Sequence, residues 1–174
     1  MPEPPDYPEC LKHLLHRKIW SSTLGEVEIY ILTPSDDKPE QTFIKPSHDT
    51  KAFSAIIEPK DQMISCLLEG IPDVMSPLSP SMPVHCSEVV EMISEYRVYV
   101  INGSIRSVCQ YKGPEGLLDL SVVEEAVKIF ASSEEAVAGC AMDFAAMKKL
   151  GAPEDSKPIT CLVEVNDGYS LGWY

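Results

Sequence analysis

The sequence is poor in basic residues and has no long hydrophobic run. Of its 174 residues, 14 are Lys or Arg and 27 are Asp or Glu, which gives a net charge of −13. Because nucleic acids and anionic membranes are themselves negatively charged, this balance argues against either as the main partner. The longest apolar runs, such as residues 98–101, are far shorter than the roughly 20 residues that a membrane-spanning helix needs. We therefore expect no nucleic-acid partner and no membrane partner.

The sequence also lacks the signals of a secreted or zinc-binding protein. Its six cysteines are scattered without a pair at metal-knuckle spacing, and its four histidines form no metal cluster. The cysteines are interpreted as reduced thiols, most of them small core residues. The first residues, 1–6, are acidic and proline-rich, which fits neither a secretory nor a mitochondrial signal. Together these features predict a cytoplasmic protein.

Several catalytic motifs are missing as well. The sequence contains no nucleophile elbow, Walker loop, Rossmann glycine pattern or His-Glu-x-x-His. Hydrolase and dinucleotide-binding functions therefore lack support. The hydrophobic fraction of 44% and the charged fraction of 24% are ordinary for a soluble globular domain.

The hydrophobic pattern predicts an α+β domain with mixed strands and few helices. Residues 136–150 stay open, because their alanines favour a helix whereas their apolar period is unclear. Residues 72–83 contain four prolines among serines and are expected to be a loop or a poor helix. The predicted strands are 27–32, 42–44, 51–58, 62–68, 97–101, 104–111 and 160–165, and the predicted helices are 10–21 and 120–131.

A hairpin is the clearest local prediction. Asn102-Gly103 separates two alternating runs, and both residues accept the positive φ that a two-residue turn requires. Such a turn places Tyr99 opposite Arg106, so that Arg97 and Arg106, two of the three arginines, share one face. Guanidinium groups there could clamp a phosphate or a carboxylate. From the hairpin alone, an exposed polar face with Glu95 as an ion-pair partner is the favoured interpretation.

Two further clusters carry oxygen ligands or positive charge. On the strand 160–165 and the residues after it, Glu164 and Asn166 are expected on one face together with Leu162, and such oxygen ligands suit Mg²⁺. The alternative is an edge strand that ends in a turn. Lys45, at the end of the strand 42–44, could bind phosphate. The alternative is a surface lysine that protects a sheet edge.

In their order along the chain, these motifs resemble the ATP-grasp superfamily. The resemblance covers about residues 42–174 and is greatest to a clade named for a shared arginine and two lysines, related in fold to the ribosomal-protein glutamate ligases. The motifs are Phe43-Ile44-Lys45-Pro46, Ser87-Glu88-Val89-Val90, Glu95-Tyr96-Arg97-Val98, Asn102-Gly103, Tyr111-Lys112-Gly113, Asp143, and Glu164-Val165-Asn166-Asp167-Gly168.

The resemblance implies a role for each matching residue. Arg97 and Lys51 are expected to be catalytic, acting on phosphate or on a substrate carboxylate. Asp143, Glu164 and Asn166 are expected to bind Mg²⁺. The residues expected to bind ATP are Lys45, Lys51, Ser87, Glu88, Val89, Val90, Arg97 and Lys112, with residues 87–90 as the hinge that meets adenine. The resemblance also implies that residues 136–146 form a strand that pairs with residues 160–166.

The implied fold has two α+β lobes with antiparallel sheets, at approximately 27–86 and 93–174, and the nucleotide between them. Residues 1–41 are expected to be an N-terminal extension or remnant, because the pre-ATP-grasp domain of the relatives is reduced or missing, and residues 42–174 the ATP-grasp domain. The long insert at 148–157 departs from the family pattern.

The implied function is that of an ATP-dependent carboxylate–amine ligase that acts through an acyl phosphate, with ATP and Mg²⁺ as cofactors. Its carboxylate and amine substrates are unknown and could include a peptide or protein. The alternative is a nucleotide-binding interaction module, or a truncated ligase, without turnover. A third interpretation is a structural α+β domain whose polar clusters lie on the surface.

Overall fold

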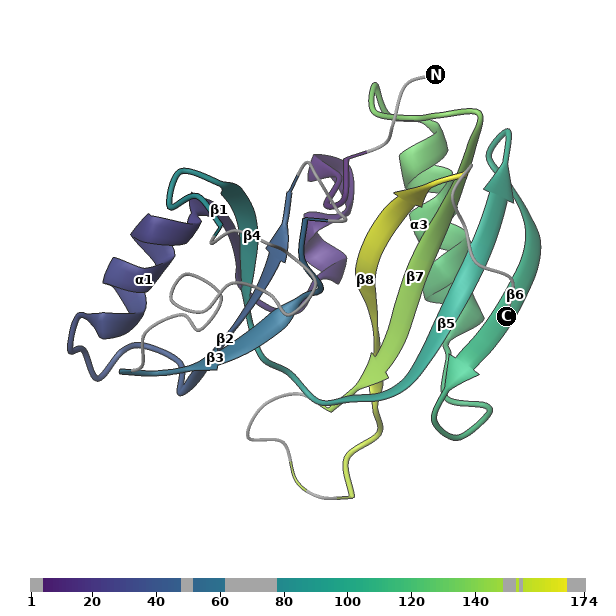
Figure 1. Ribbon diagram of the computed structural model, residues 1–174. Helices are drawn as coiled ribbons and strands as arrows, with labels where there is room; N and C mark the ends of the chain where they lie inside the picture. Colours follow the sequence, from purple (N-terminus) through teal and green to yellow (C-terminus); the bar gives the residue numbers. More distant parts are fainter. Residues whose placement is uncertain (1–4, 48–51, 62–77, 149–152, 154, 169–174) are drawn as a thin grey trace. The chain divides into compact units, whose positions relative to one another are not determined.

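A computed structural model describes residues 5–47, 52–61, 78–148, 153 and 155–168 (Figure 1). The chain divides into two compact units, one formed by residues 17–89 and the other by residues 1–16 and 90–174. Each unit has its own antiparallel sheet of four strands. Among the described residues, no helix is both long and apolar enough to cross a membrane.

The unit of residues 17–89 is a sheet covered by one helix. Its strands are β1 (Ile19–Thr23), β2 (Gln41–Pro46), β3 (Ile56–Pro59) and β4 (Pro83–Glu88), in the order β1-β4-β2-β3. Helix α1 (Leu24–Leu32) packs its apolar side against the sheet. The buried residues of this core are Leu24, Val27, Ile31, Ile44, Phe53, Val84 and Cys86. The predicted strand 42–44 is confirmed as the centre of β2, and β3 confirms the end of the strand predicted at 51–58, whose residues 52–55 are not in a strand.

Two predictions near the N-terminus are wrong. Residues 27–32 lie in α1 rather than in a strand, because Thr23 and Glu26 form a capping box that starts a helix. Residues 10–21 do not form one helix: a 3₁₀ helix, η1 (Glu9–Leu14), is followed by β1. There, antiparallel pairing of Trp20 with Cys86 of β4 overrides the local helical pattern. The predicted strand 62–68 lies outside the described residues.

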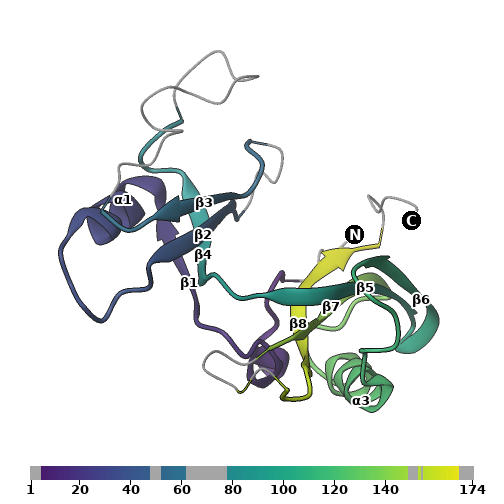
Figure 2. The ribbon, with the colours of Figure 1, turned by 90° about the horizontal axis from the view of Figure 1, so that it is seen from below.

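The other unit carries a sheet with the strand order β6-β5-β7-β8. Its strands are β5 (Met92–Ile101), β6 (Ser104–Lys112), β7 (Gly139–Met147) and β8 (Ile159–Asp167). Helix α3 (Leu120–Ala131) covers one face of this sheet (Figure 2). Its buried side consists of Val123, Ala126, Val127 and Phe130. Fully buried side chains of the sheet, such as Val98, Met142, Phe144 and Leu162, complete the core.

Most sequence predictions for this unit are confirmed. Asn102 and Gly103 have φ values of 49° and 68° and form the turn between β5 and β6. Helix α3 spans the predicted residues, and the Asp119 side chain accepts a hydrogen bond from the Ser121 amide as its N-cap. The open stretch 136–150 contains strand β7, which pairs with β8 as the resemblance implied.

Two register shifts make the predicted orientation of some side chains wrong. Between β5 and β6 the register shifts at Tyr99, so that Ser107 rather than Arg106 lies opposite Tyr99. Between β7 and β8 it shifts after Asp143, so that Leu162 lies opposite the buried Phe144. Leu162 therefore belongs to the core and does not share the face of Glu164. A bulge changes which face the following residues occupy, which a strict alternation rule cannot anticipate.

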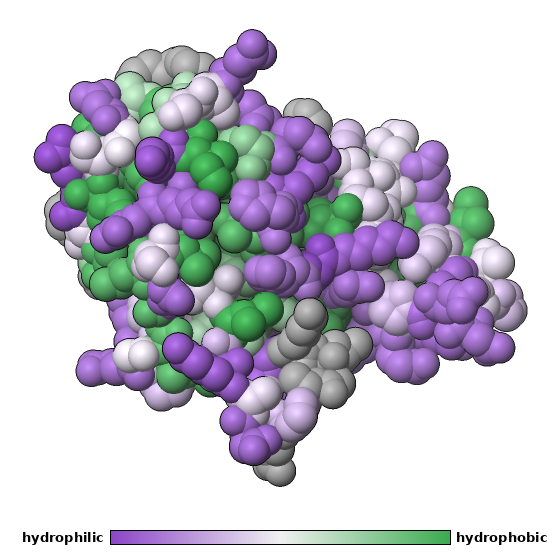
Figure 3. Space-filling view, turned by 180° about the vertical axis from the view of Figure 1, so that it is seen from behind, coloured by the Kyte–Doolittle hydropathy of each residue, from purple (hydrophilic) through white to green (hydrophobic). Residues whose placement is uncertain are grey.

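The surface carries both hydrophobic and hydrophilic residues. Seen from behind, hydrophobic residues are interspersed with hydrophilic ones (Figure 3). A cavity of about 750 Å³ lies at the N-terminal end of α3, beside Leu14, Leu117, Lys157 and Ile159. None of the predicted site residues lines it.

Candidate functional site

The polar residues of the second sheet gather on the face that α3 does not cover. Strand β5 alternates strictly, with Tyr96, Val98 and Val100 buried and Arg97 between them on the opposite side. Arg97 lies directly opposite Asp143 of β7, and Asp143 lies opposite Glu164 of β8. Three adjacent strands therefore place an arginine and two carboxylates in one row.

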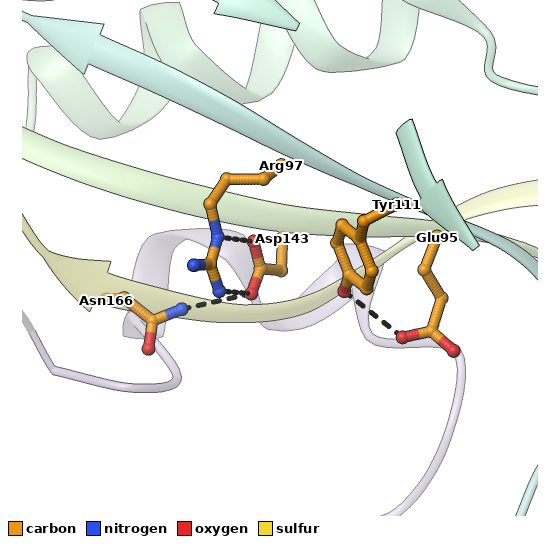
Figure 4. A network of polar contacts seen from close by, with 5 residues as sticks. All are labelled: Glu95, Arg97, Tyr111, Asp143 and Asn166. Atoms are coloured by element: carbon orange, nitrogen blue, oxygen red, sulfur yellow. Dashed lines mark hydrogen bonds and ion pairs between the residues drawn. The ribbon is translucent and has the colours of Figure 1, made fainter. Parts of the chain in front are cut away.

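Arg97 and Asp143 form a largely buried, bidentate ion pair (Figure 4). The Arg97 Nε donates to Asp143 Oδ1 at 2.8 Å, and the Arg97 Nη2 donates to Asp143 Oδ2 at 2.7 Å. The two side chains are only 12% and 4% exposed. Asn166 adds a third hydrogen bond, from its Nδ2 to Asp143 Oδ2 at 3.2 Å. Planar bidentate pairing of this kind fixes orientation as well as charge.

A second polar group lies on the same face, next to the ion pair. Tyr111 of β6 donates from its hydroxyl to Glu95 Oε2 at 3.1 Å (Figure 4). Lys112 forms an ion pair with the other oxygen of Glu95. From the sequence, Lys112 was expected to bind the nucleotide and Glu95 only to pair with the arginine face, while Tyr111 had no expected role. Alternation along β5 could have indicated Glu95, since it lies two residues before Arg97.

Burial governs the ionisation of this cluster. Desolvation raises the pKa of the Asp143 carboxyl group, and the negative charges of Glu164 and Glu95 raise it further, whereas the Arg97 guanidinium acts in the opposite direction. Desolvation also raises the pKa of the Tyr111 hydroxyl, with further contributions from Asp143 and Glu95. Tyr111 therefore remains a neutral donor at neutral pH.

The residues predicted to bind Mg²⁺ fit that ion by their chemistry. Asp143, Glu164 and Asn166 offer two carboxylates and an amide oxygen, which are the hard ligands that Mg²⁺ prefers. Asp143 and Glu164 are cross-strand neighbours, and after burial the negative charge of Glu164 contributes to the raised pKa of Asp143. Across the described part of the chain, no three His, Cys, Asp or Glu side chains form a metal-binding group by themselves. A Mg²⁺ site built from Asp143 and Glu164 therefore needs the amide oxygen of Asn166 as its third protein ligand.

The remaining predicted residues, apart from Lys112 and Val90, belong to the first unit. Lys45 lies on β2 opposite His85 of β4, and its neighbour Ile44 points into the core beneath α1. Ser87 and Glu88 end β4, where the Glu88 carboxylate accepts a hydrogen bond from the Lys18 amide at 2.9 Å. The first unit ends at Val89 and the second resumes at Val90. Lys51 lies outside the described residues.

The cysteines confirm their interpretation as core residues. Cys86, Cys140 and Cys161 are buried, and none of the five cysteines in the described ranges forms a disulfide. Burial raises the pKa of Cys86 to about 12 and that of Cys140 to about 11, which makes both thiols unreactive at neutral pH.

Comparison with solved structures identifies the fold as ATP-grasp. The ATP-grasp ligase PsnB, complexed with the precursor peptide PsnA2 and AMPPNP, is 16% identical with a TM-score of 0.50, over 90% of this chain and 45% of PsnB. The D-alanine–D-alanine ligase from Bacillus anthracis, complexed with ATP, is 11% identical with a TM-score of 0.51, over 90% of this chain and 50% of the ligase. The chain thus spans about half the length of the solved structures it matches.

The family follows from the sequence match. Residues 14–174 match an ATP-grasp domain, family 2 of the clade named for one arginine and two lysines, and the chain belongs to this family. The resemblance stated from the motifs is therefore confirmed, and so is the α+β ATP-grasp fold with two antiparallel sheets. No curated protein matches the chain.

Proposed function

We propose that this chain binds ATP with Mg²⁺ on the polar face of strands β5, β7 and β8, and that it serves an ATP-dependent carboxylate–amine ligation. The observation that carries the proposal is the row of Arg97, Asp143 and Glu164 across three strands, joined by Asn166. This row combines a cation for phosphate oxygens with oxygen ligands for a metal ion. The family match supports the same assignment.

The predicted residues would divide the binding of metal ion, phosphates and adenine among them. Asp143, Glu164 and Asn166 would hold Mg²⁺, which neutralises phosphate charge when it is bound. Arg97 and Lys51 would offset the charge that develops as the γ-phosphoryl group passes to a carboxylate, and Lys45 and Lys112 would bind the nucleotide. Residues 87–90, at the boundary of the two units, would meet adenine with backbone groups.

The reaction would proceed in two steps. The substrate carboxylate attacks the γ-phosphorus of ATP, which yields an acyl phosphate and ADP. An amine then attacks the acyl carbon and expels phosphate, so that an amide forms. The protein's contribution is positioning and charge stabilisation rather than covalent participation. A peptide or protein is proposed among the substrates, since the PsnB structure named above holds a precursor peptide.

A binding module without turnover is the second candidate. It would need the nucleotide site alone, without a site for the carboxylate and the amine. Incubation of the pure chain with ATP, Mg²⁺ and a pool of amino acids and peptides separates the two candidates. Acceptor-dependent release of ADP and phosphate would support the ligase, whereas saturable ATP binding without such release would support the binding module.

Glu164→Gln tests the site itself. The substitution keeps the shape of the side chain but removes its negative charge, so we expect the affinity for Mg²⁺-AMPPNP to fall about tenfold or more, as for loss of one close charge pair. Calorimetry measures the affinity, and circular dichroism checks the fold. Glu125→Gln, an exposed change on α3, is the matched control. Equal affinities for the two variants would remove Glu164 from the site.

A further inference from the structure

The carboxylate of Asp143 is occupied in the structure. Both of its oxygens accept hydrogen bonds from the Arg97 guanidinium, and Oδ2 accepts one more from Asn166. The Asp143 side chain is only 4% exposed, so it has little contact with water. The same carboxylate is one of the three groups assigned to Mg²⁺ above.

Arg97 and a metal ion compete for the lone pairs of Asp143, because three of about four lone-pair sites of a carboxylate already accept hydrogen bonds. Mg²⁺ binds oxygen at about 2.0–2.1 Å and demands near-ideal octahedral directions. A guanidinium that donates to both oxygens at 2.7 and 2.8 Å covers the edge of the carboxylate that such an ion would approach. Two cations side by side would also repel each other in a poorly solvated site.

We propose that Arg97 and the divalent cation are alternative partners of Asp143. In the nucleotide-free protein Arg97 holds the carboxylate and keeps its affinity for metal ions low. When Mg²⁺ arrives with ATP, the guanidinium leaves Asp143 for the triphosphate, and the metal takes its place. This inference rests on the proposed function, because it takes Asp143 as a metal ligand, and it adds how metal loading is tied to the nucleotide.

The exchange makes metal and nucleotide bind cooperatively. Without nucleotide, the metal must displace Arg97 from a buried carboxylate, and the bidentate ion pair is lost. With nucleotide, the phosphate oxygens offer the Arg97 guanidinium another anionic partner, so the metal binds more tightly. By linkage, the metal strengthens nucleotide binding to the same extent. The protein thereby takes up a metal ion together with ATP rather than alone.

Arg97→Gln tests this exchange because its two expected effects have opposite signs. Mn²⁺ serves as the probe, and the electron paramagnetic resonance signal of the free ion reports how much is bound. Without nucleotide, the variant should bind Mn²⁺ about tenfold more tightly than the wild-type protein, since a unit positive charge next to the site is gone. Its calorimetric affinity for Mg²⁺-AMPPNP should fall, because Arg97 no longer contacts the phosphates.

Three further variants define the effect. Arg106→Gln removes the same charge from an exposed position of β6 and should change neither affinity. Arg97→Gln combined with Asp143→Asn should lose the gain in Mn²⁺ affinity. Arg97→Lys keeps the charge but lacks the planar guanidinium, so its gain in Mn²⁺ affinity should be smaller. This variant replaces Arg97→Gln in the test if the glutamine variant fails to fold.

The failure of the exchange and the failure of the metal site give different results. If Asp143→Asn weakens Mn²⁺ binding while Arg97→Gln and Arg97→Lys leave it unchanged or weaker, the exchange is overturned and the metal assignment stands. If Asp143→Asn and Glu164→Gln both leave Mn²⁺ binding unchanged, the metal assignment falls and the exchange falls with it.

Discussion

Removing Arg97 should destabilise the second unit by more than any exposed charge removal. Arg97→Met retains most of the apolar stem but leaves the Asp143 carboxylate buried without its ionic partner, and Asn166 remains as its hydrogen-bond donor among the described residues. Loss of one partner of a buried ion pair costs about 3–5 kcal/mol. An exposed pair contributes only about 0–1 kcal/mol. With side chains that are 12% and 4% exposed, this pair is closer to a buried pair than to an exposed one.

Native-state hydrogen exchange of the β7 amides measures this cost. It reports the opening free energy of the strand itself, which suits a chain of two units better than a single global unfolding curve. The double variant Arg97→Met with Asp143→Leu should recover most of the loss, since an apolar pair of similar volume needs no countercharge. A loss below about 1 kcal/mol in the single variant would show that the pair contributes no more than an exposed one. A double variant as unstable as the single one would show that the unpaired Asp143 carboxylate is not the cause of the loss.

The same variant should respond to pH in a defined direction. The pKa of Asp143 is raised in the folded protein, chiefly by burial. The folded state therefore binds the Asp143 proton more tightly than the unfolded state, and this contribution to stability is fully present below the unfolded pKa and is lost as pH rises through the folded pKa. Because Arg97 lowers the pKa of Asp143, Arg97→Met should raise that pKa further. Protonation of Asp143 should then stabilise the folded variant up to a higher pH than in the wild-type protein. Acidification from neutral pH should then narrow the stability gap to the wild-type protein.

Two other substitutions test the local architecture. Gly113→Ala should cost about 2–5 kcal/mol, because Gly113 has φ +80° and a Cβ there would lie 2.0 Å from the Ile93 carbonyl oxygen. Gly116→Ala, at φ +77° with nothing within 4 Å, should cost about 1–2 kcal/mol and is the matched control. Thr23→Ala should lower the stability of the first unit by about 1 kcal/mol, since it removes half of the capping box of α1. Hydrogen exchange near each site measures these changes, and equal costs for the two glycines would contradict the close approach at Gly113.

The sequence predicted the second unit better than the first. The Asn102-Gly103 turn and the amphipathic pattern of α3 are local signals, and both elements are where the pattern predicted them. Helix α1 was mistaken for a strand because residues 27–32 are β-branched and apolar. Its spacing of Leu24, Val27 and Ile31 is nevertheless helical, and the Thr23–Glu26 capping box, which is visible in the sequence, decides the matter.

The candidate site depended on long-range information. Strand β7 could not be read from its own alanines, and the family resemblance supplied the pairing that puts Asp143 opposite Glu164. The pairing of Arg97 with Asp143 follows once β5 and β7 are neighbours, which no local pattern shows. The register shifts beside Tyr99 and Asp143 were out of reach, because a bulge is set by cross-strand geometry rather than by residue type alone.

The central claim is that the polar face built by Arg97, Asp143, Glu164 and Asn166 binds a nucleotide together with Mg²⁺. The most direct test is calorimetric titration of the wild-type chain with AMPPNP, once with Mg²⁺ and once with a chelator. We expect saturable binding with Mg²⁺ and an affinity at least about tenfold lower without it, as for a metal ion that joins phosphates to protein carboxylates. Absence of binding in both titrations, or equal affinity in both, would contradict this claim.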